Sequence, residues 1–513
     1  MDIAFTAIKK YRYQITMFLI GSIFIITRLY LLGVVPSGIH VDEAGMAYDA
    51  YNLLNYGTDR YGNPFPVYLI NFDAGQSALY AYLASLCIRL FGLSLVSVRI
   101  PAVFSGALLL IFGYLIGANI KDKKTGCVIA FLITVCPYFI MSSRWGLDCN
   151  LFLGFFTMSL YFFMKAVECK RLKYYVLAGI SYGITLYSYS ISWITLPVFL
   201  LIGVIYLCYN RLADWKKLMV MGIPLLLLAL PLMAVLLVNN GVIHEIKTDC
   251  FTVPKLFYYR GGEFSLSNIR SNLKLFRTLL THDHLNYNAD ASFGTLYYIS
   301  IPFLALGFVL YCIRFIKSIK RRVYDPGILV LLMGISVLFC SLVVFDGYII
   351  NKANAIYFSF AVFIAEALMY VWKKCKAAAG GLGVVYLVLF LIFCNSYFNV
   401  NRNEKMLFFD KGLTESVRLV EVEMKEFEGK VYVDPGDIQQ PYIYMCLAAK
   451  LSPEEFMTSR ADSATHYGRY YFDMPDNIDR EAVYIVYNGS QYSAVLDKSG
   501  FECIMIEDYF VYY

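Results

Sequence analysis

The sequence predicts an α-helical polytopic membrane protein that ends in a small extracytoplasmic α/β domain. Hydrophobic residues make up 59% of the 513 residues and charged residues only 16%, whereas an average soluble domain has about a quarter charged residues. Mean hydropathy is +0.58, and long apolar runs recur up to about residue 398. Beyond that point, short β-branched and aromatic runs replace them.

Apolar runs of ~17–25 residues are long enough to cross a bilayer as helices. The first run follows Lys9, Lys10 and Arg12, and no small-residue cleavage site comes after it, which favours an uncleaved span. In total we identify about eleven candidate spans, at 15–35, 99–119, 127–143, 151–168, 174–191, 193–210, 217–238, 293–313, 327–345, 353–372 and 381–398.

Clusters of lysine and arginine predict the orientation of these spans, because positively charged loops remain in the cytoplasm. Counted between the predicted spans, six clusters fall on one side, at 9–12, 121–124, 170–173, 211–217, 314–322 and 373–376. We therefore expect a plasma-membrane protein with a cytoplasmic N-terminus. This orientation requires the apolar stretch 77–92 to lie at the outer interface, since another crossing would invert every later cluster.

Charge and cysteine usage exclude several function classes. The net charge of +6 does not indicate a nucleic-acid partner, because the basic residues lie in short clusters between apolar runs. The thirteen cysteines show no ligand spacing, and many lie in apolar runs where cysteine behaves as a small hydrophobic residue. We expect neither a disulfide framework nor a cysteine-based zinc site.

Two domains follow from this pattern. Residues 1–398 form the predicted transmembrane domain, including an outer loop at 36–98 with interfacial helices and a second outer loop at 239–291. Residues 399–513 form the extracytoplasmic domain, with a helix that starts near Thr414 and has Gly429 at its C-cap position. Its predicted strands lie within 430–435, 482–490 and 509–513.

An adjacent acid pair, Asp42 and Glu43, directly follows the first span. Apolar residues recur at helical spacing from 41 to 56, which predicts an amphipathic helix on the outer surface, with Asp42, Asp49 and Asn52 on its polar face. Carboxylates at a helix start stabilise it through the helix dipole and by capping. The same acids could instead act as catalysts at the water–lipid boundary, and the pattern alone does not separate the two interpretations.

Two further outer segments hold polar candidates. Arg144 and Asp148 lie four residues apart, and they form either an ion pair at a helix end or part of a phosphate site. Arg60, Asp73 and Gln76 lie in an aromatic loop punctuated by proline and glycine. This loop either holds a sugar or serves as a scaffold.

The remaining candidates are single residues or short pairs. His282 and His284 are weak candidates for metal ligands, because a His-x-His pair is common in solvated loops. Arg260 precedes two glycines and could meet an anion. Lys352 at the outer start of a span is either a phosphate partner or a snorkelling anchor.

Three stretches resemble the GT-C glycosyltransferases that use polyprenyl-phosphate sugars, in the branch of protein O-mannosyltransferase-like and lipid A aminoarabinose transferase-like enzymes. They are VDEAGMAYDAYNLLNYG after the first span, LYAYLASLCIRLFGLSLVSVRIPAVFSGAL entering the second, and SRWGLDCNLFLGFF between the third and fourth. A softer match is FGTLYYISIPFLALG. The likeness covers roughly the first 200 residues and a patch near 300.

The resemblance implies a transferase that moves a monosaccharide from a polyprenyl-phosphate donor in the lipid bilayer to an extracytoplasmic acceptor, which is a protein, a lipid or a cell-surface glycan. Asp42 then corresponds to the catalytic acid–base residue, with Glu43 as its neighbour and Tyr48 in the substrate loop. Arg144 and Asp148 match the pair near the donor phosphate. A single base suffices for an inverting displacement. A cation must stabilise the leaving phosphate, so a divalent metal is possible although no cofactor is certain.

One departure affects the donor site. The aminoarabinose transferase branch usually has a Lys-Pro pair where this chain reads DAGQSAL. Phosphate binding then falls to another cation, chosen among Arg60, Arg99, Arg144, Arg260 and Lys352. The alternative functions are a membrane transporter and a non-catalytic partner in the assembly or export of a cell-envelope polymer. A transporter is disfavoured because the predicted spans carry few charges and the two halves of the chain do not match.

Overall fold

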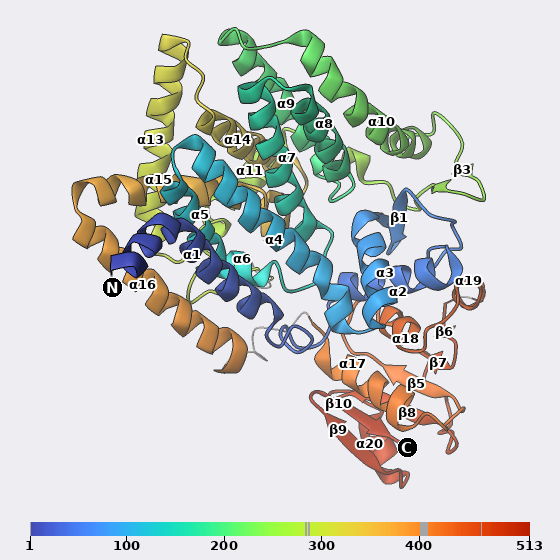
Figure 1. Ribbon diagram of the computed structural model, residues 1–513. Helices are drawn as coiled ribbons and strands as arrows, with labels where there is room; N and C mark the ends of the chain where they lie inside the picture. Colours follow the sequence, from blue (N-terminus) through green and yellow to red (C-terminus); the bar gives the residue numbers. More distant parts are fainter. Residues whose placement is uncertain (1, 283–284, 286–287, 401–408, 463) are drawn as a thin grey trace. The chain divides into compact units, whose positions relative to one another are not determined.

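The computed structural model describes residues 2–282, 285, 288–400, 409–462 and 464–513 (Figure 1). The chain divides into two compact units. We call Met1–Leu31, Pro101–Ala234 and Arg260–Asn401 the helical unit. We call Leu32–Ile100, Val235–Tyr259 and Arg402–Tyr513 the mixed unit, because it contains both helices and strands.

Every predicted span coincides with helical structure. Among the described residues, seven helices are long and apolar enough to cross a membrane: α4 (Leu95–Ile120), α7 (Cys149–Cys169), α9 (Ser192–Tyr209), α10 (Trp215–Asn239), α13 (Ser300–Arg321), α15 (Ile356–Lys374) and α16 (Lys376–Asn395). The other predicted spans correspond to α1 (Asp2–Leu29), α5 (Lys123–Val135) with α6 (Pro137–Met141), α8 (Leu172–Leu186) and α14 (Gly327–Val343). The multi-pass helical architecture is confirmed, and the count of eleven spans stays a prediction.

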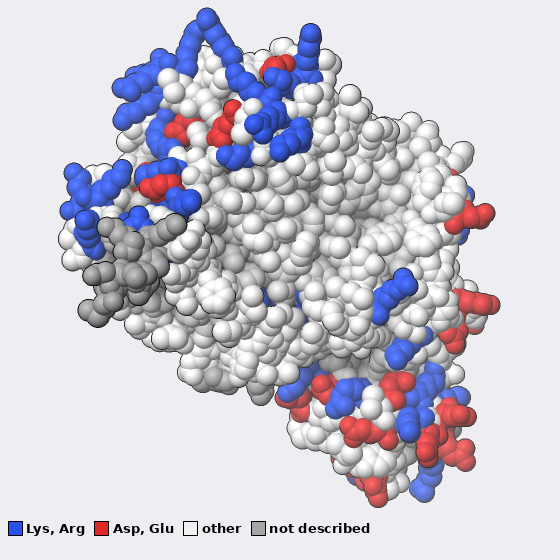
Figure 2. Space-filling view, in the orientation of Figure 1, with Lys and Arg blue, Asp and Glu red and all other residues white. Residues whose placement is uncertain are grey.

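The basic clusters lie at alternate connections between these helices. Lys or Arg residues occupy the turns α4–α5, α7–α8, α9–α10, α13–α14 and α15–α16, which is the arrangement expected if the chain crosses once between successive basic and non-basic turns. Figure 2 shows Lys and Arg side chains gathered over the α9–α10 and α13–α14 turns, beside a broad surface with almost no charge. This uncharged surface is what lipid contact requires.

Short elements connect the longer helices of the helical unit. They are η1 (Arg260–Glu263), α11 (Asn268–Asn272), α12 (Leu275–Thr278), η2 (Ile350–Ala353) and the π-helical turn η3 (Ser396–Val400). Asn272 on α11 donates from its side-chain nitrogen to the carbonyl oxygens of Leu342 and Val344 at 3.0 and 2.6 Å. These two bonds hold the 260–280 segment against the end of α14.

The mixed unit is built around α2 (Val41–Tyr56), whose bounds match the predicted helix. His40 is its N-cap and Gly57, with φ +71°, is its C-cap. The expected exposed polar face is wrong, because Asp49 and Asn52 are completely buried. A hairpin of β1 (Tyr68–Asn71) and β2 (Ala74–Ser77), the helix α3 (Leu79–Phe91), and the short pair β3 (Ile246–Lys247) and β4 (Thr252–Val253) complete this part.

Helix α3 occupies the apolar stretch whose position decides the predicted orientation. It has 13 residues, a length of roughly 20 Å at the usual rise per residue, and is therefore too short for the hydrocarbon core of a bilayer. Its tyrosines hold it to neighbouring segments of the same unit. Tyr80 donates to the Val98 carbonyl oxygen at 2.8 Å, and Tyr82 donates to that of Pro66 at 3.0 Å.

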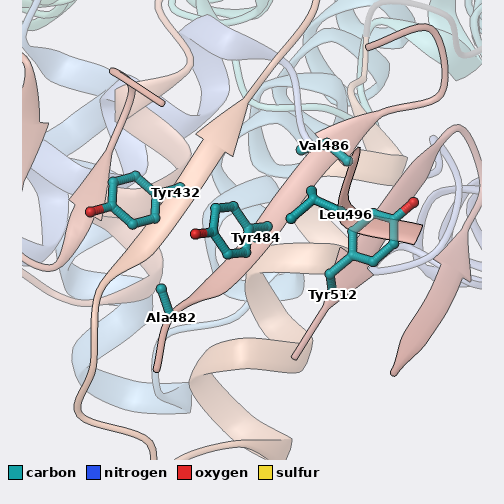
Figure 3. Packing of buried hydrophobic residues seen from close by; sticks show 6 residues of the cluster. All are labelled: Tyr432, Ala482, Tyr484, Val486, Leu496 and Tyr512. Atoms are coloured by element: carbon teal, nitrogen blue, oxygen red, sulfur yellow. The ribbon is translucent and has the colours of Figure 1, made fainter. Parts of the chain in front are cut away.

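The C-terminal part of the chain forms a six-stranded sheet with the order β6-β7-β5-β8-β10-β9. The central strand β5 (Val431–Asp434) pairs in parallel with β8 (Val483–Tyr487), and β10 (Tyr509–Tyr512) runs antiparallel to β8. These three strands confirm the predicted ones. The outer strands are β6 (His466–Tyr467), β7 (Tyr470–Tyr471) and β9 (Cys503–Ile506). Figure 3 shows the packed core on one face of this sheet, made by Tyr432, Ala482, Tyr484, Val486, Leu496 and Tyr512.

Four helices and a π-helical turn accompany the sheet. They are α17 (Lys411–Arg418), η5 (Leu419–Glu423), α18 (Tyr442–Ala448), α19 (Pro453–Ala461) and α20 (Ser493–Lys498). The predicted C-cap at Gly429 is wrong, because the helical stretch that starts at Lys411 ends at Glu423. Both signs of charge cover this domain (Figure 2), as expected for a surface in water.

The C-terminal domain contacts α2 and its flanking segments within the mixed unit. At Gly38, whose φ is +80°, an added Cβ would lie 1.8 Å from the Phe409 carbonyl oxygen. Tyr48 donates to the carbonyl oxygen of Leu451 at 2.9 Å. These contacts join two parts of the chain that are far apart in the sequence.

We predict that Gly38→Ala destabilises the protein by about 3 kcal/mol or more, because the new Cβ would overlap backbone atoms of the C-terminal segment. Gly500→Ala is the matched control. Its φ is +82°, with no atom within 4 Å of a new Cβ, so it carries only the strain of a left-handed residue, about 1–2 kcal/mol. The thermal midpoint in detergent measures both. Equal destabilisation by the two variants would contradict the close backbone contact.

Candidate functional site

The candidate residues divide between the two units. The helical unit contains Arg144, Asp148, Arg260, His282 and Lys352, and His284 lies outside the described residues. The mixed unit contains Asp42, Glu43, Tyr48, Arg60, Asp73, Gln76 and Arg99.

Asp42 is the accessible acid of the adjacent pair. It lies in the first turn of α2, and its backbone N–H donates to Nδ1 of His40 at 3.1 Å. Its Oδ1 accepts a hydrogen bond from Nδ2 of Asn71 at 3.2 Å, and its Oδ2 lies 3.8 Å from His40 Nδ1. The side chain is 34% exposed, so a ligand can reach this carboxylate.

Glu43 is completely buried in a bidentate ion pair with Arg99. Arg99 donates to the two carboxylate oxygens at 2.9 and 3.0 Å. Its other N–H groups donate to the carbonyl oxygens of Leu32, Pro36 and Gly38 at 2.8–2.9 Å. All five N–H groups of this guanidinium are therefore engaged, and Arg99 holds the chain between the first helix and α2.

A second buried pair lies further along α2. Arg60 donates from Nε and Nη2 to the carboxylate of Asp49 at 2.9 and 2.6 Å, and both side chains are completely buried. Nη2 of Arg60 also donates to the Gly45 carbonyl oxygen at 2.7 Å and to Oδ1 of Asn71 at 3.3 Å. The pair explains why Asp49 faces inward, against the expectation of an exposed polar face.

Asn71 and Asp49 belong to the site although sequence reasoning missed both. Asn71 is the last residue of β1, directly before a two-residue turn of Phe72 and Asp73, both with positive φ. Such turns close β-hairpins tightly, and the NFDAG stretch was a readable signal for one. Asp49 lies seven residues after Asp42, two helical turns away on the same face.

Asp73, Gln76 and Tyr48 do not hydrogen-bond to the Asp42 carboxylate within the part of the chain that the structure describes. Asp73 accepts from Nη2 of Arg460 at 2.5 Å. Gln76 pairs with Leu69 in the β1–β2 hairpin and is buried. Together with the bond from Tyr48 to Leu451, the Asp73–Arg460 bond attaches the C-terminal domain to the hairpin and α2.

Burial raises the pKa values of two further acids of the mixed unit. Burial raises the pKa of Asp59 to about 6, against the hydrogen bonds it accepts from the backbone of Tyr61 and Asn63. Burial also raises the pKa of Asp410, which accepts a hydrogen bond from the Tyr444 hydroxyl. Tyr444 lies within the electrostatic influence of Asp42 and Glu43, so the C-terminal domain places a polar pair near the start of α2.

In the helical unit, Arg144 binds the end of a helix. Its Nη1 donates to the carbonyl oxygens of Thr27 and Arg28 at 2.7 and 2.9 Å, and its Nη2 donates to that of Tyr30 at 2.8 Å. These carbonyls form the C-terminal end of α1, where cations are favourable. Asp148 accepts the Cys149 N–H at 2.7 Å at the start of α7. Both residues thus act as helix caps in this structure.

Arg28, which sequence reasoning missed, caps the C-terminal end of α5. It is completely buried near the end of α1 and donates to the carbonyl oxygens of Ile133 and Thr134 at 2.8 and 2.7 Å. A small pocket beside this region is lined by Ser105, Ser142, Ser143 and Asn150, with apolar walls from α4 and α7. An arginine within an apolar run was the readable signal.

Arg260 and Lys352 lie on the segments that follow α10 and α14, and Glu263 is an acid near both of them. Arg260 Nε lies 3.6 Å from Oε1 of Glu263, and its side chain is 58% exposed. Lys352 donates to the Phe345 carbonyl oxygen, and burial lowers the pKa of its amine while Glu263 opposes that shift. The backbone N–H of Phe345 donates to the Glu263 carbonyl oxygen at 2.9 Å, which joins the two segments.

No group of three or more metal-ligating side chains is present among the described residues. His282 is partly buried in the segment before α13, whereas its predicted partner His284 is outside the described ranges. The thirteen cysteines are free in the structure.

Residues 76–238 match the family model of dolichyl-phosphate-mannose-protein mannosyltransferases. No curated protein sequence is significantly similar to the chain. The fold is similar to that of ArnT from Cupriavidus metallidurans in the apo state, with 12% identity, a TM-score of 0.54, and coverage of 96% of this chain and 97% of ArnT.

The structure of the same ArnT bound to undecaprenyl phosphate is also similar, with 12% identity, a TM-score of 0.57 and the same coverage of 96% and 97%. The match extends over nearly all of both chains, so it includes the helical architecture and the C-terminal domain. These findings confirm the predicted resemblance: the chain is a multi-pass membrane protein with the GT-C glycosyltransferase fold, and residues 76–238 carry the mannosyltransferase family pattern.

Proposed function

We propose that the protein is an integral membrane glycosyltransferase that moves a monosaccharide from a polyprenyl-phosphate donor to an extracytoplasmic acceptor, with Asp42 as general base. One observation carries this proposal. Of the two adjacent acids, Glu43 is buried and neutralised by Arg99, whereas 34% of the Asp42 side chain is exposed. The fold similarity to ArnT, whose structure with undecaprenyl phosphate is known, supports the class of donor.

The reaction is a single displacement at the anomeric carbon. The acceptor hydroxyl oxygen attacks that carbon, the bond from the carbon to the phosphate oxygen breaks, and the lipid phosphate leaves with the bonding electrons. The carboxylate of Asp42 takes the proton of the acceptor hydroxyl during the attack, which requires hydrogen-bond contact with it. One base and no enzyme nucleophile give inversion at the anomeric carbon.

The leaving phosphate needs a cation in the absence of the Lys-Pro pair. Arg99 and Arg60 are engaged in buried carboxylate pairs, and Arg144 caps the end of α1. Arg260 remains accessible to a phosphate, since 58% of its side chain is exposed, and Lys352 is a second cation near the same acid, Glu263. We therefore assign donor phosphate binding to Arg260 and Lys352, with a divalent metal as an additional candidate for the same charge.

We predict that Asp42→Asn lowers transferase activity about 10²- to 10⁴-fold, the usual contribution of a general base. The amide oxygen can still accept the Asn71 hydrogen bond, so folding and membrane level are expected to remain normal. The measurement is product formation by mass spectrometry with a panel of polyprenyl-phosphate sugars, with and without EDTA. Full product in this variant would show that Asp42 is not the base, whereas absence of product from the wild-type protein with every donor would favour a transporter or a non-catalytic partner in polymer assembly.

We predict the opposite outcome for Glu43→Gln. Removal of the negative charge leaves Arg99 buried without a counter-ion, which typically costs about 3–5 kcal/mol. The thermal midpoint and the membrane level should fall, while activity per folded molecule should decrease far less than in Asp42→Asn. A well-folded Glu43→Gln protein without activity would show that the base had been assigned to the wrong acid.

We predict that Lys352→Ala raises the KM for the lipid donor about 10- to 100-fold, because a hydrogen bond to a charged group is worth about 1.5–3 kcal/mol. Arg270→Ala is the matched control, since Arg270 is an exposed cation on α11 of the same outer segment and is outside the proposed site. Initial rates over a donor concentration series measure both. Equal donor KM values in the two variants would exclude Lys352 from phosphate binding.

A further inference from the structure

We propose that Asn71 is a positioning residue that holds the catalytic carboxylate of Asp42. This inference rests on the proposed function, because it concerns how that base is oriented. Asn71 lies at the end of β1 and is only 7% exposed. Its side-chain amide bridges two charged residues, Asp42 and Arg60. Nδ2 donates to Oδ1 of Asp42 at 3.2 Å, and Oδ1 accepts from Nη2 of Arg60 at 3.3 Å.

The charge of Arg60 decides which way the amide faces. A guanidinium only donates hydrogen bonds, and an ionised carboxylate only accepts them. The amide oxygen of Asn71 must therefore face Arg60, and its NH₂ group must face Asp42. The reverse orientation would set donor against donor and acceptor against acceptor, so Arg60 specifies the donor that Asp42 receives.

Arg60 is itself held rigidly. Its bidentate pair with Asp49 and its bond to the Gly45 carbonyl oxygen come from one face of α2. Gly45 leaves the room that this arrangement requires, because a Cβ there would lie 2.7 Å from Oδ1 of Asn71 and 3.0 Å from Nη2 of Arg60. Asp42, Gly45 and Asp49 thus form a single stripe on α2, and the Asn71 amide completes it.

The consequence is a carboxylate with one oxygen fixed and one available. Oδ1 of Asp42 is occupied by Asn71, and Oδ2 is 3.8 Å from Nδ1 of His40, which already accepts the Asp42 backbone N–H. Oδ2 is therefore the atom that takes the proton of the acceptor.

Other charged groups also lie near Asp42. They are His40 at the N-cap, Glu43 with Arg99, Arg60 with Asp49, and Asp410 with Tyr444 from the C-terminal domain. A change of pH profile in Asn71→Asp therefore includes the effect of the carboxylate that it introduces, whereas a change in Asn71→Ser reports on the loss of the amide.

The test uses Asn71→Asp and Asn71→Ser in the full-length membrane protein. Asn71→Asp keeps the shape and can accept from Arg60, but it sets a second carboxylate against Asp42. We expect kcat to fall about 10- to 100-fold, as for small displacements of a catalytic group, with little change in donor KM. We also expect the acidic limb of the pH–rate profile to move to higher pH. Asn71→Ser retains a donor and should recover part of the activity.

Asn55→Asp is the matched control. Asn55 is exposed on α2, the helix that carries Asp42, and its side chain donates to the Tyr51 carbonyl oxygen one turn earlier. It should keep the wild-type kcat and pH profile. Thermal midpoints of all variants separate positioning from stability. Loss of stability with unchanged kcat and pH profile in both Asn71 variants would overturn the inference. Activity in Asp42→Asn would instead overturn the proposed function itself.

Discussion

The burial of two arginines against helix α2 is the constraint on which the mixed unit depends. A buried guanidinium must have a carboxylate and enough acceptors, because an uncompensated charge in the interior is very costly. Arg99 takes Glu43 and three backbone carbonyls. Arg60 takes Asp49, the Gly45 carbonyl and the Asn71 amide oxygen, and its Nη1 has no hydrogen-bond partner among the described residues. Both pairs fix the rotation of α2 about its axis. Once that rotation is set, Asp42 is the acid of the helix that remains accessible.

The C-terminal domain completes this arrangement rather than forming an independent appendage. Its segments contact Gly38 before α2, Tyr48 within α2 and Asp73 in the turn between β1 and β2. The loop and the domain therefore belong to the same compact unit, although hundreds of residues separate them in the sequence. The domain therefore packs against segments on both sides of Asp42.

Much of the architecture could be predicted from local patterns. Apolar runs of sufficient length marked the helices, and β-branched and aromatic runs marked β5, β8 and β10. The helix from Val41 to Tyr56 was predicted at both ends, because the pattern of apolar residues stops at Gly57, a left-handed cap. The Gly429 cap was wrong because α17 continues into a π-helical turn that ends at Glu423. The apolar pattern along the chain does not mark this change from α- to π-helical geometry.

The sequence by itself determined the fold class and the position of the acid pair, Asp42 and Glu43, in the first turn of a helix. It also determined which acidic and basic side chains follow the predicted spans. Only the tertiary structure decided what each of those groups does. Asp49 was expected in solvent and is buried, because Arg60 approaches it from a loop eleven residues further on. Asn71 reaches Asp42 from a hairpin. Hydrophobic periodicity is a property of neighbouring residues and can be read along the chain, whereas charge compensation depends on which distant side chain arrives, and that requires the folded chain.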